Sequence, residues 1–104
     1  MKKLYWEGVS HKERTTGISE IEQVVNKHGF LLDFKMFSDI SISMIIELPE
    51  RKVDQLYTDL ETYMAMDPFE KIGSENTRDC TVLFNVVFAK GSGDLKIEVP
   101  SVPG

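Results

Sequence analysis

Hydrophobic positions recur along the chain with two different periods, and their order predicts the secondary structure. Segment 3–9 is short, aromatic and β-prone, which predicts a first strand. In segment 18–28 apolar residues recur three or four positions apart, which is typical of an amphipathic helix. Gly29 follows directly and predicts the end of that helix, because glycine is the commonest residue just past a helix C-terminus.

Two alternating segments follow and predict a β-hairpin. One apolar stripe takes every other residue of segment 32–36, and another takes every other residue of segment 40–48. Pairing Met36 with Ile40 keeps both stripes on one face of the sheet. This register predicts a three-residue loop, 37–39, between the two strands.

The next segment predicts a second helix and a long connection. Pro49 opens an amphipathic stretch that continues to residue 64, and proline is well suited to the first turn of a helix. The polar stretch 65–79 contains a proline and a glycine and predicts a loop.

The end of the chain predicts two more strands. Segment 80–88 alternates strongly, and after a glycine-rich turn a short strand is expected over 95–99. Residues 100–104 are expected to form a loose tail.

The first six of these elements follow the order βαββαβ, which predicts an α+β fold of the ferredoxin-like kind. With right-handed crossovers, this order gives an antiparallel sheet with both helices on one face. The first strand then lies between the fourth and the third, and the second strand lies at the far edge. A less regular α+β sandwich is the alternative. We expect residues 1–104 to form a single domain with a short additional C-terminal strand.

Composition and charge narrow the possible partners. The chain has 104 residues, of which 41% are hydrophobic and 28% charged, which is typical of a globular protein. Its net charge of −5 argues against binding to nucleic acid, which needs a basic patch, and against an anionic membrane surface. No apolar run approaches the roughly 20 residues needed to span a bilayer.

The N-terminus and the cysteine content favour a cytoplasmic location. The first residues are basic, as in a signal peptide, but no apolar region follows them. Cys80 is the only cysteine, so an internal disulfide is impossible and a reducing compartment is expected.

A candidate ligand site lies in the loop before the first predicted helix. The predicted topology brings the loop 10–17, the hairpin loop and the connection 65–79 to one end of the sheet. Helix N-termini favour anions, and these loops contain four basic residues: Lys12, Arg14, Lys71 and Arg78. We therefore expect a small anionic ligand, such as a carboxylate or phosphate, or else a solvated polar connection. The predicted ligand-binding residues are Lys12, Arg14, Thr15, Thr16, Gly17, Ile18 and Ser19.

Two short motifs resemble those of ACT-type regulatory domains. In "TTGISEIEQVV" a loop glycine, Gly17, stands before Ile18 and the apolar stripe of the first helix. In "NKHGFLLDF" a small residue, Gly29, stands between that helix and the hairpin. The resemblance covers roughly residues 3–90. It implies a non-catalytic domain that binds amino acids or other small effectors near the loop after the first strand, at a subunit interface.

The face of the sheet away from the helices is expected to be apolar and to contact a partner. Its predicted members are Tyr5, Val9, Leu31, Phe37, Ile45, Leu83 and Val87. We expect a homodimer or higher oligomer, packed face to face as in dimeric α+β barrel proteins or edge to edge as is common among ACT domains. Alternatively, the C-terminal strand folds back over this face.

Catalytic residues are scarce. His11 with Glu13 could serve acid–base chemistry, but no third member is evident, while His28 is expected at a helix end. Cys80 at the start of a buried strand is expected to pack as a small apolar residue. We expect no catalytic residues, no metal and no cofactor, and a small-molecule sensor with a regulatory role. The alternatives are a small dimeric α+β barrel enzyme and a purely structural subunit.

Overall fold

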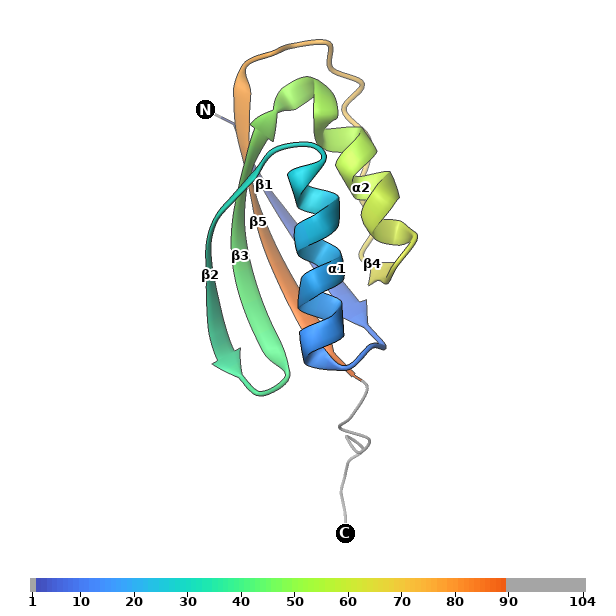
Figure 1. Ribbon diagram of the computed structural model, residues 1–104. Helices are drawn as coiled ribbons and strands as arrows, with labels where there is room; N and C mark the ends of the chain where they lie inside the picture. The colour runs from blue at the N-terminus through green and yellow to red at the C-terminus, as the bar shows by residue number, and fades with distance from the viewer. Residues whose placement is uncertain (1, 90–104) are drawn as a thin grey trace, which may run out of the picture.

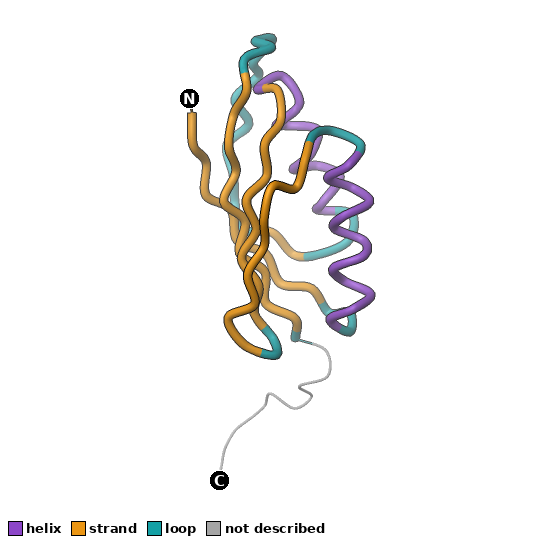
Figure 2. Tube along the Cα trace, turned by 60° about the vertical axis from the view of Figure 1, so that its left-hand side comes forward, coloured by secondary structure: helices purple, strands orange, loops and turns teal. Residues whose placement is uncertain are grey.

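The computed structural model describes residues 2–89, which form one mixed five-stranded sheet with two helices on one face (Figures 1 and 2). In chain order the elements are β1 (Lys2–Ser10), α1 (Arg14–Asn26), β2 (Phe30–Ser38), β3 (Ser41–Pro49), the short 3₁₀ turn η1 (Glu50–Lys52), α2 (Val53–Glu61), β4 (Ala65–Met66) and β5 (Asp79–Phe88). The α+β class is therefore confirmed. The predicted strand 95–99 and tail 100–104 lie outside the described residues. Within residues 2–89 no helix is long and apolar enough to cross a membrane.

The predicted strand order is wrong. The strands lie in the order β2-β3-β5-β1-β4, so β5 separates β3 from β1 instead of lying at the edge. It pairs antiparallel with β3 and parallel with β1, where Trp6 lies opposite Phe84. A simple antiparallel ferredoxin-like sheet is thus not what the chain forms.

The long connection explains the difference. After α2, β4 pairs antiparallel with Gly8 and Val9 of β1. The chain then runs back through residues 67–78 to the opposite end of the sheet (Figure 1), where the N–H of Glu50 donates to the carbonyl of Arg78 over 2.8 Å. Twelve extended residues span up to roughly 40 Å, so β5 can begin at the same end as β1 and run parallel to it.

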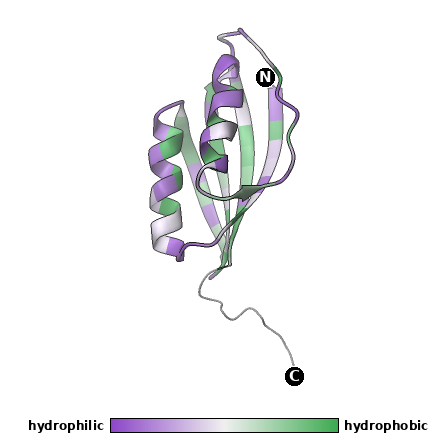
Figure 3. Ribbon diagram, turned by 90° about the vertical axis from the view of Figure 1, so that its right-hand side faces the viewer, coloured by the Kyte–Doolittle hydropathy of each residue, from purple (hydrophilic) through white to green (hydrophobic). Residues whose placement is uncertain are grey.

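The hydrophobic core lies between the helices and the sheet. The apolar stripes of both helices face the strands, as the residue hydropathy in Figure 3 shows, and their buried side chains are Ile21, Val24, Val25, Val53, Leu56, Tyr57 and Leu60. Phe84, in the middle of β5, is fully buried, and Trp6 is also in the core. The indole of Trp6 makes edge-on contacts with the rings of Tyr57 and Phe69, at centroid distances of 5.3 and 5.1 Å. Both Phe84 and Trp6 therefore point toward the helices.

The hairpin differs in register from the prediction. Met36 lies opposite Ile42 rather than Ile40, and Ser38 pairs with Ser41, so the turn is shorter than the predicted loop 37–39. The pairing is irregular between Met36 and Ser38, where Phe37 is an extra residue of β2 without a partner on β3. The two apolar stripes still share the helix-facing side, which was the reason for the predicted pairing.

Gly29 follows the C-terminus of α1 but does not have the left-handed backbone conformation, with positive φ, that usually favours glycine there. Its N–H donates to the carbonyl of Val25 over 2.8 Å, while a Cβ at this position would lie 2.3 Å from the carbonyl oxygen of Glu47. Among the glycines of the described chain only Gly73 has a positive φ. Glycine is therefore required at position 29 because the helix exit passes close to β3.

Candidate functional site

The N-terminus of α1 is capped by the chain's own carboxylate. Glu13 accepts a hydrogen bond from the N–H of Thr16 over 3.0 Å and another from the Thr16 hydroxyl over 3.3 Å. The bond from this backbone N–H is the main cause that lowers the pKa of Glu13. A bound anion would have to displace this carboxylate from the position that favours negative charge.

The two basic residues of the loop are also paired within the chain. The Lys12 ammonium lies 2.7 Å from Glu20 Oε2. The Arg14 guanidinium donates to the carbonyl of Asp39 over 3.3 Å and lies 3.7 Å from its carboxylate. The first loop and the hairpin turn therefore meet at one end of the sheet, as expected, but their charges face each other.

The remaining predicted site residues have mixed positions. Gly17 is buried, and a Cβ there would lie 2.5 Å from the ring of Phe88, so this glycine provides room for packing. Thr15, Thr16 and Ser19 are exposed. Arg14 and Ile18 line an open depression together with residues 36–39. Gly17, which lies inside α1 and not in the loop before it, is thus explained by core packing alone.

Lys71 and Arg78 do not join this end of the sheet, and the expectation that they do is wrong. The N–H of Gly73 donates to Asp54 at the start of α2 over 2.8 Å, and Arg78 lies beside Glu50. Both contacts are at the opposite end, because the connection runs back along the sheet before β5 begins (Figure 1).

The face of the sheet that the helices leave uncovered, here called the open face, has an apolar centre. Tyr5, Leu83 and Ile45 lie side by side on β1, β5 and β3. In the next row Asn85 lies beside Ser43. These central strands position the side chains rigidly, because each is paired along its length.

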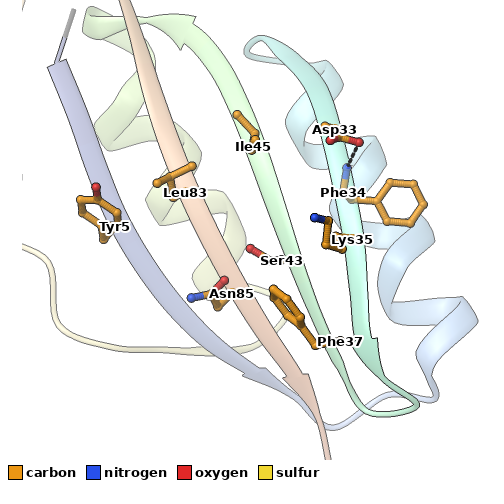
Figure 4. Close-up of a pocket in the computed structure, with 9 residues that line it drawn as sticks. All are labelled: Tyr5, Asp33, Phe34, Lys35, Phe37, Ser43, Ile45, Leu83 and Asn85. Carbon is orange, nitrogen blue, oxygen red and sulfur yellow. Dashed lines mark hydrogen bonds between the residues drawn. The ribbon is translucent and has the colours of Figure 1, made fainter.

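A hollow of about 420 Å³ occupies this part of the open face (Figure 4). Its lining residues are Tyr5, Asp33, Phe34, Lys35, Phe37, Ser43, Ile45, Leu83 and Asn85. In Figure 4 the ring of Phe37 lies over the strands beside Asn85, whereas the ring of Phe34 points away from the hollow. The predicted apolar face is therefore confirmed for Tyr5, Phe37, Ile45 and Leu83.

Of the other members of the predicted face, Leu31 lies elsewhere, whereas Val9 and Val87 are confirmed. Leu31 packs against the core, because an irregularity between Leu31 and Asp33 shifts the alternation of β2. Val9 and Val87 line a neighbouring depression on the same open face. The polar residues of the hollow, Asp33, Lys35, Ser43 and Asn85, were not predicted as site residues. Single polar residues are common on the exposed face of a strand, so the sequence gives no signal that these four lie together.

The polar groups of the hollow can recognise a ligand but are poorly suited to catalysis. Asn85 and Ser43 offer hydrogen-bonding groups, and Lys35 forms no ion pair within the described chain. The carboxylate of Asp33 accepts the N–H of Phe34 over 2.8 Å. No histidine or cysteine lines the hollow among residues 2–89.

The histidines and the cysteine, which are the side chains most often used in catalysis, lie outside the hollow. His28 Nε2 lies 2.6 Å from Asp59 Oδ2 and joins the ends of the two helices, and this hydrogen bond lowers the pKa of Asp59. His11 is exposed on the loop. Cys80 is buried, and burial raises the pKa of its thiol, which disfavours the reactive thiolate. Residues 2–89 contain no group of side chains that could hold a metal ion.

Comparison with known proteins finds no matching family model, no similar curated protein and no similar solved structure. The resemblance to ACT domains stays a prediction.

Proposed function

We propose that this protein is a non-catalytic binding domain with a sensing or regulatory role, and that its ligand occupies the hollow on the open face. The ligand class that fits is a small, flat, largely apolar or aromatic molecule that carries an acidic group. The apolar floor of Tyr5, Ile45 and Leu83 beside the Lys35 ammonium is the observation that supports this proposal. Residues 12–19 receive less support as the binding site, because their charges are paired within the chain.

The chemistry of the two candidate places supports this choice. At the loop, Glu13, Glu20 and Asp39 already provide negative charge to the helix N-terminus and to both basic side chains. In the hollow, apolar surface is exposed next to a cation without a carboxylate partner in the described chain. Binding sites for small molecules commonly combine an apolar lining with a few polar groups that fix the orientation.

A small enzyme of the dimeric barrel kind receives less support. Acid–base catalysis needs a group that can exchange a proton with the substrate at a suitable pKa. The ionisable residues that line the hollow are Tyr5, Asp33 and Lys35, and Asp33 is held by the Phe34 N–H. Ser43 lies opposite Lys35 in the pairing of β3 with β2, but no hydrogen bond joins the Ser43 hydroxyl to a base among the described residues.

The proposal is tested with the fluorescent probe 8-anilinonaphthalene-1-sulfonate, which is aromatic and anionic. We expect saturable binding to the folded protein with one probe per hollow. Leu83→Glu places a negative charge on the floor of the hollow and should weaken binding by at least about tenfold, the effect of about 1.4 kcal/mol.

Val87→Glu is the matched control. Val87 is on the same strand and on the same open face, but it lies outside the lining of the hollow. This variant should bind the probe nearly as well as the unmodified protein. Equal loss in both variants, or no saturable binding by the unmodified protein, would contradict the proposed site.

A structural subunit is the second candidate. It is favoured by the exposed apolar side chains of β2 that lie outside the hollow, Phe30, Leu32 and Met36, which no ligand in the hollow would cover.

A further inference from the structure

The edge strand β2 is unusually apolar on its exposed surfaces. Eight large apolar side chains are exposed in the described chain, and five of them are on this one strand. They are Phe30, Leu32, Phe34, Met36 and Phe37. β2 is at the end of the strand order, with β3 on one side and no strand of residues 2–89 on the other (Figure 1). A long apolar edge strand is a template for pairing with another strand.

The hydrogen-bond pattern of β3 shows which groups of β2 are free. The N–H of Phe88 donates to the carbonyl of Ile40 over 2.8 Å, and Ser41 lies opposite Val87. In an antiparallel ladder this makes Ser41 and Val87 a non-hydrogen-bonded pair, so Ser41 turns its N–H and C=O toward β2. The backbone N–H and C=O groups of successive residues along a strand point alternately to the neighbouring strand on one side and on the other.

Met44 is three residues after Ser41 on β3, so its backbone N–H and C=O point the other way, toward β5. Phe34, which lies opposite Met44, is therefore in a non-hydrogen-bonded pair and directs its N–H and C=O to the free edge. The Phe34 N–H in fact donates to Asp33 Oδ1 rather than into the ladder. Met36, opposite Ile42, has the same orientation as Phe34.

We propose that a second copy of this chain pairs with this edge, β2 antiparallel to β2, about a two-fold axis that passes through Phe34. The two sheets then form one continuous ten-stranded sheet, counting five strands from each copy. Phe34 and the partner's Phe34 face each other across the axis and can exchange both backbone hydrogen bonds. Asp33, Phe34 and Lys35 also line the hollow, so in the dimer the partner's Asp33 competes with the proposed ligand for Lys35, while the apolar floor of Tyr5, Ile45 and Leu83 stays uncovered.

The register follows from charge complementarity. Asp33 and Lys35 flank Phe34 and both point to the open face, opposite Ile45 and Ser43. With the axis at Phe34, each Asp33 lies opposite the partner's Lys35, so two pairs of opposite charge form. On the other face each Leu32 lies opposite the partner's Met36. Cross-strand pairs of these kinds stabilise a sheet.

Other symmetric registers lack this complementarity. An axis at Lys35 places the two lysines opposite each other, and an axis at Asp33 does the same with the two carboxylates. Like charges directly opposite each other are destabilising. A shift by one residue in the pairing would set Phe34 against Lys35, which point to different faces of the strand.

The area and the face of the exposed side chains favour edge pairing over face-to-face packing. A fully exposed phenylalanine presents roughly 200 Å², so five side chains that are 40% to 70% exposed offer roughly 500 Å² per copy. Two copies would cover roughly 1,000 Å², about the lower limit for a specific interface. Packing through the open face would leave Leu32, Phe34 and Met36 in water.

The test measures the mass in solution by sedimentation velocity with charge-reversed variants of the full chain. We expect the unmodified protein to be largely dimeric at about 100 µM, above a micromolar Kd. Asp33→Lys and Lys35→Asp each place like charges opposite each other twice, and each should weaken the dimer by at least about tenfold. Both residues are exposed, so folding, checked by circular dichroism, should be unchanged.

Two further samples test the register itself. The double variant Asp33→Lys/Lys35→Asp should recover the dimer, because opposite charges again face each other. An equimolar mixture of the two single variants should form a heterodimer for the same reason. A monomeric unmodified protein, single variants that dimerise normally, or a failure of both rescues would overturn the proposal. A dimer that is lost in Val87→Glu but not in the β2 variants would establish face-to-face packing instead.

Discussion

Phe84→Ala tests the assigned hydrophobic core most severely, because no fully buried side chain of the described chain is larger than that of Phe84. Phe84 is fully buried in the middle of β5, between Met44 of β3 and Trp6 of β1. Removing a buried phenylalanine ring costs about 3–5 kcal/mol, with the higher values where the cavity cannot collapse. Strands pair with β5 on both sides and helices cover its inner face, so we expect about 4 kcal/mol.

The assay is urea unfolding at low micromolar protein, followed by far-ultraviolet circular dichroism. Phe30→Ala is the matched control, because Phe30 is 70% exposed on the edge strand and its truncation should change the free energy of unfolding by less than about 0.5 kcal/mol. The total free energy of unfolding of such a chain is about 5–15 kcal/mol, so Phe84→Ala can fail to fold. Phe84→Leu, with an expected loss of about 1–2 kcal/mol, then provides the measurement. Similar losses for Phe84→Ala and Phe30→Ala would refute the assigned core.

Two further predictions concern the ends of the helices. Gly29→Ala should destabilise the fold by about 1–3 kcal/mol in urea unfolding, because the new Cβ would lie 2.3 Å from the Glu47 carbonyl; an unchanged midpoint would show that the helix exit is not tightly packed. The hydrogen bond from His28 lowers the pKa of Asp59 in the folded protein, so its contribution to stability is present above the ordinary aspartate pKa. That contribution should be lost as the pH falls through the lowered value. Asp59→Asn should therefore lose less stability than the unmodified protein between neutral pH and about pH 2, and parallel pH profiles would contradict this role.

The faces of the strands could be predicted from the sequence because alternation is a local property. Period-two spacing alone places Tyr5, Ile45 and Leu83 on the face away from the helices, where the structure has them. Leu31 is the exception, because it was expected on the open face but packs against the core. The pairing irregularity between Leu31 and Asp33 causes this change of side, and it cannot be recognised from the pattern of apolar residues.

The strand order could not be predicted in this way, because the choice of neighbour is decided by contacts between distant segments. β4 has only two residues, too few to show a period, and the direction of the connection 67–78 depends on its contacts with Asp54 and Glu50. The βαββαβ element order is compatible with more than one strand order.

The charges of the candidate loop have partners within the chain that the sequence pattern does not reveal. Glu13 is not among the residues that usually cap helices, whereas Thr15, Thr16 and Ser19 nearby are of the types that do. Asp39 lies in the hairpin turn, where its contact with Arg14 depends on the tertiary fold. Predicting charge pairs of this kind requires the packing of the whole chain.

The central claim is that a small acidic, apolar ligand binds to the open face rather than to the loop before α1. Amide chemical shifts of ¹⁵N-labelled protein, recorded during titration with 8-anilinonaphthalene-1-sulfonate, locate the site directly. The account predicts that the largest changes fall on Tyr5, Ser43, Leu83 and Asn85. Changes concentrated at residues 12–19 would contradict it.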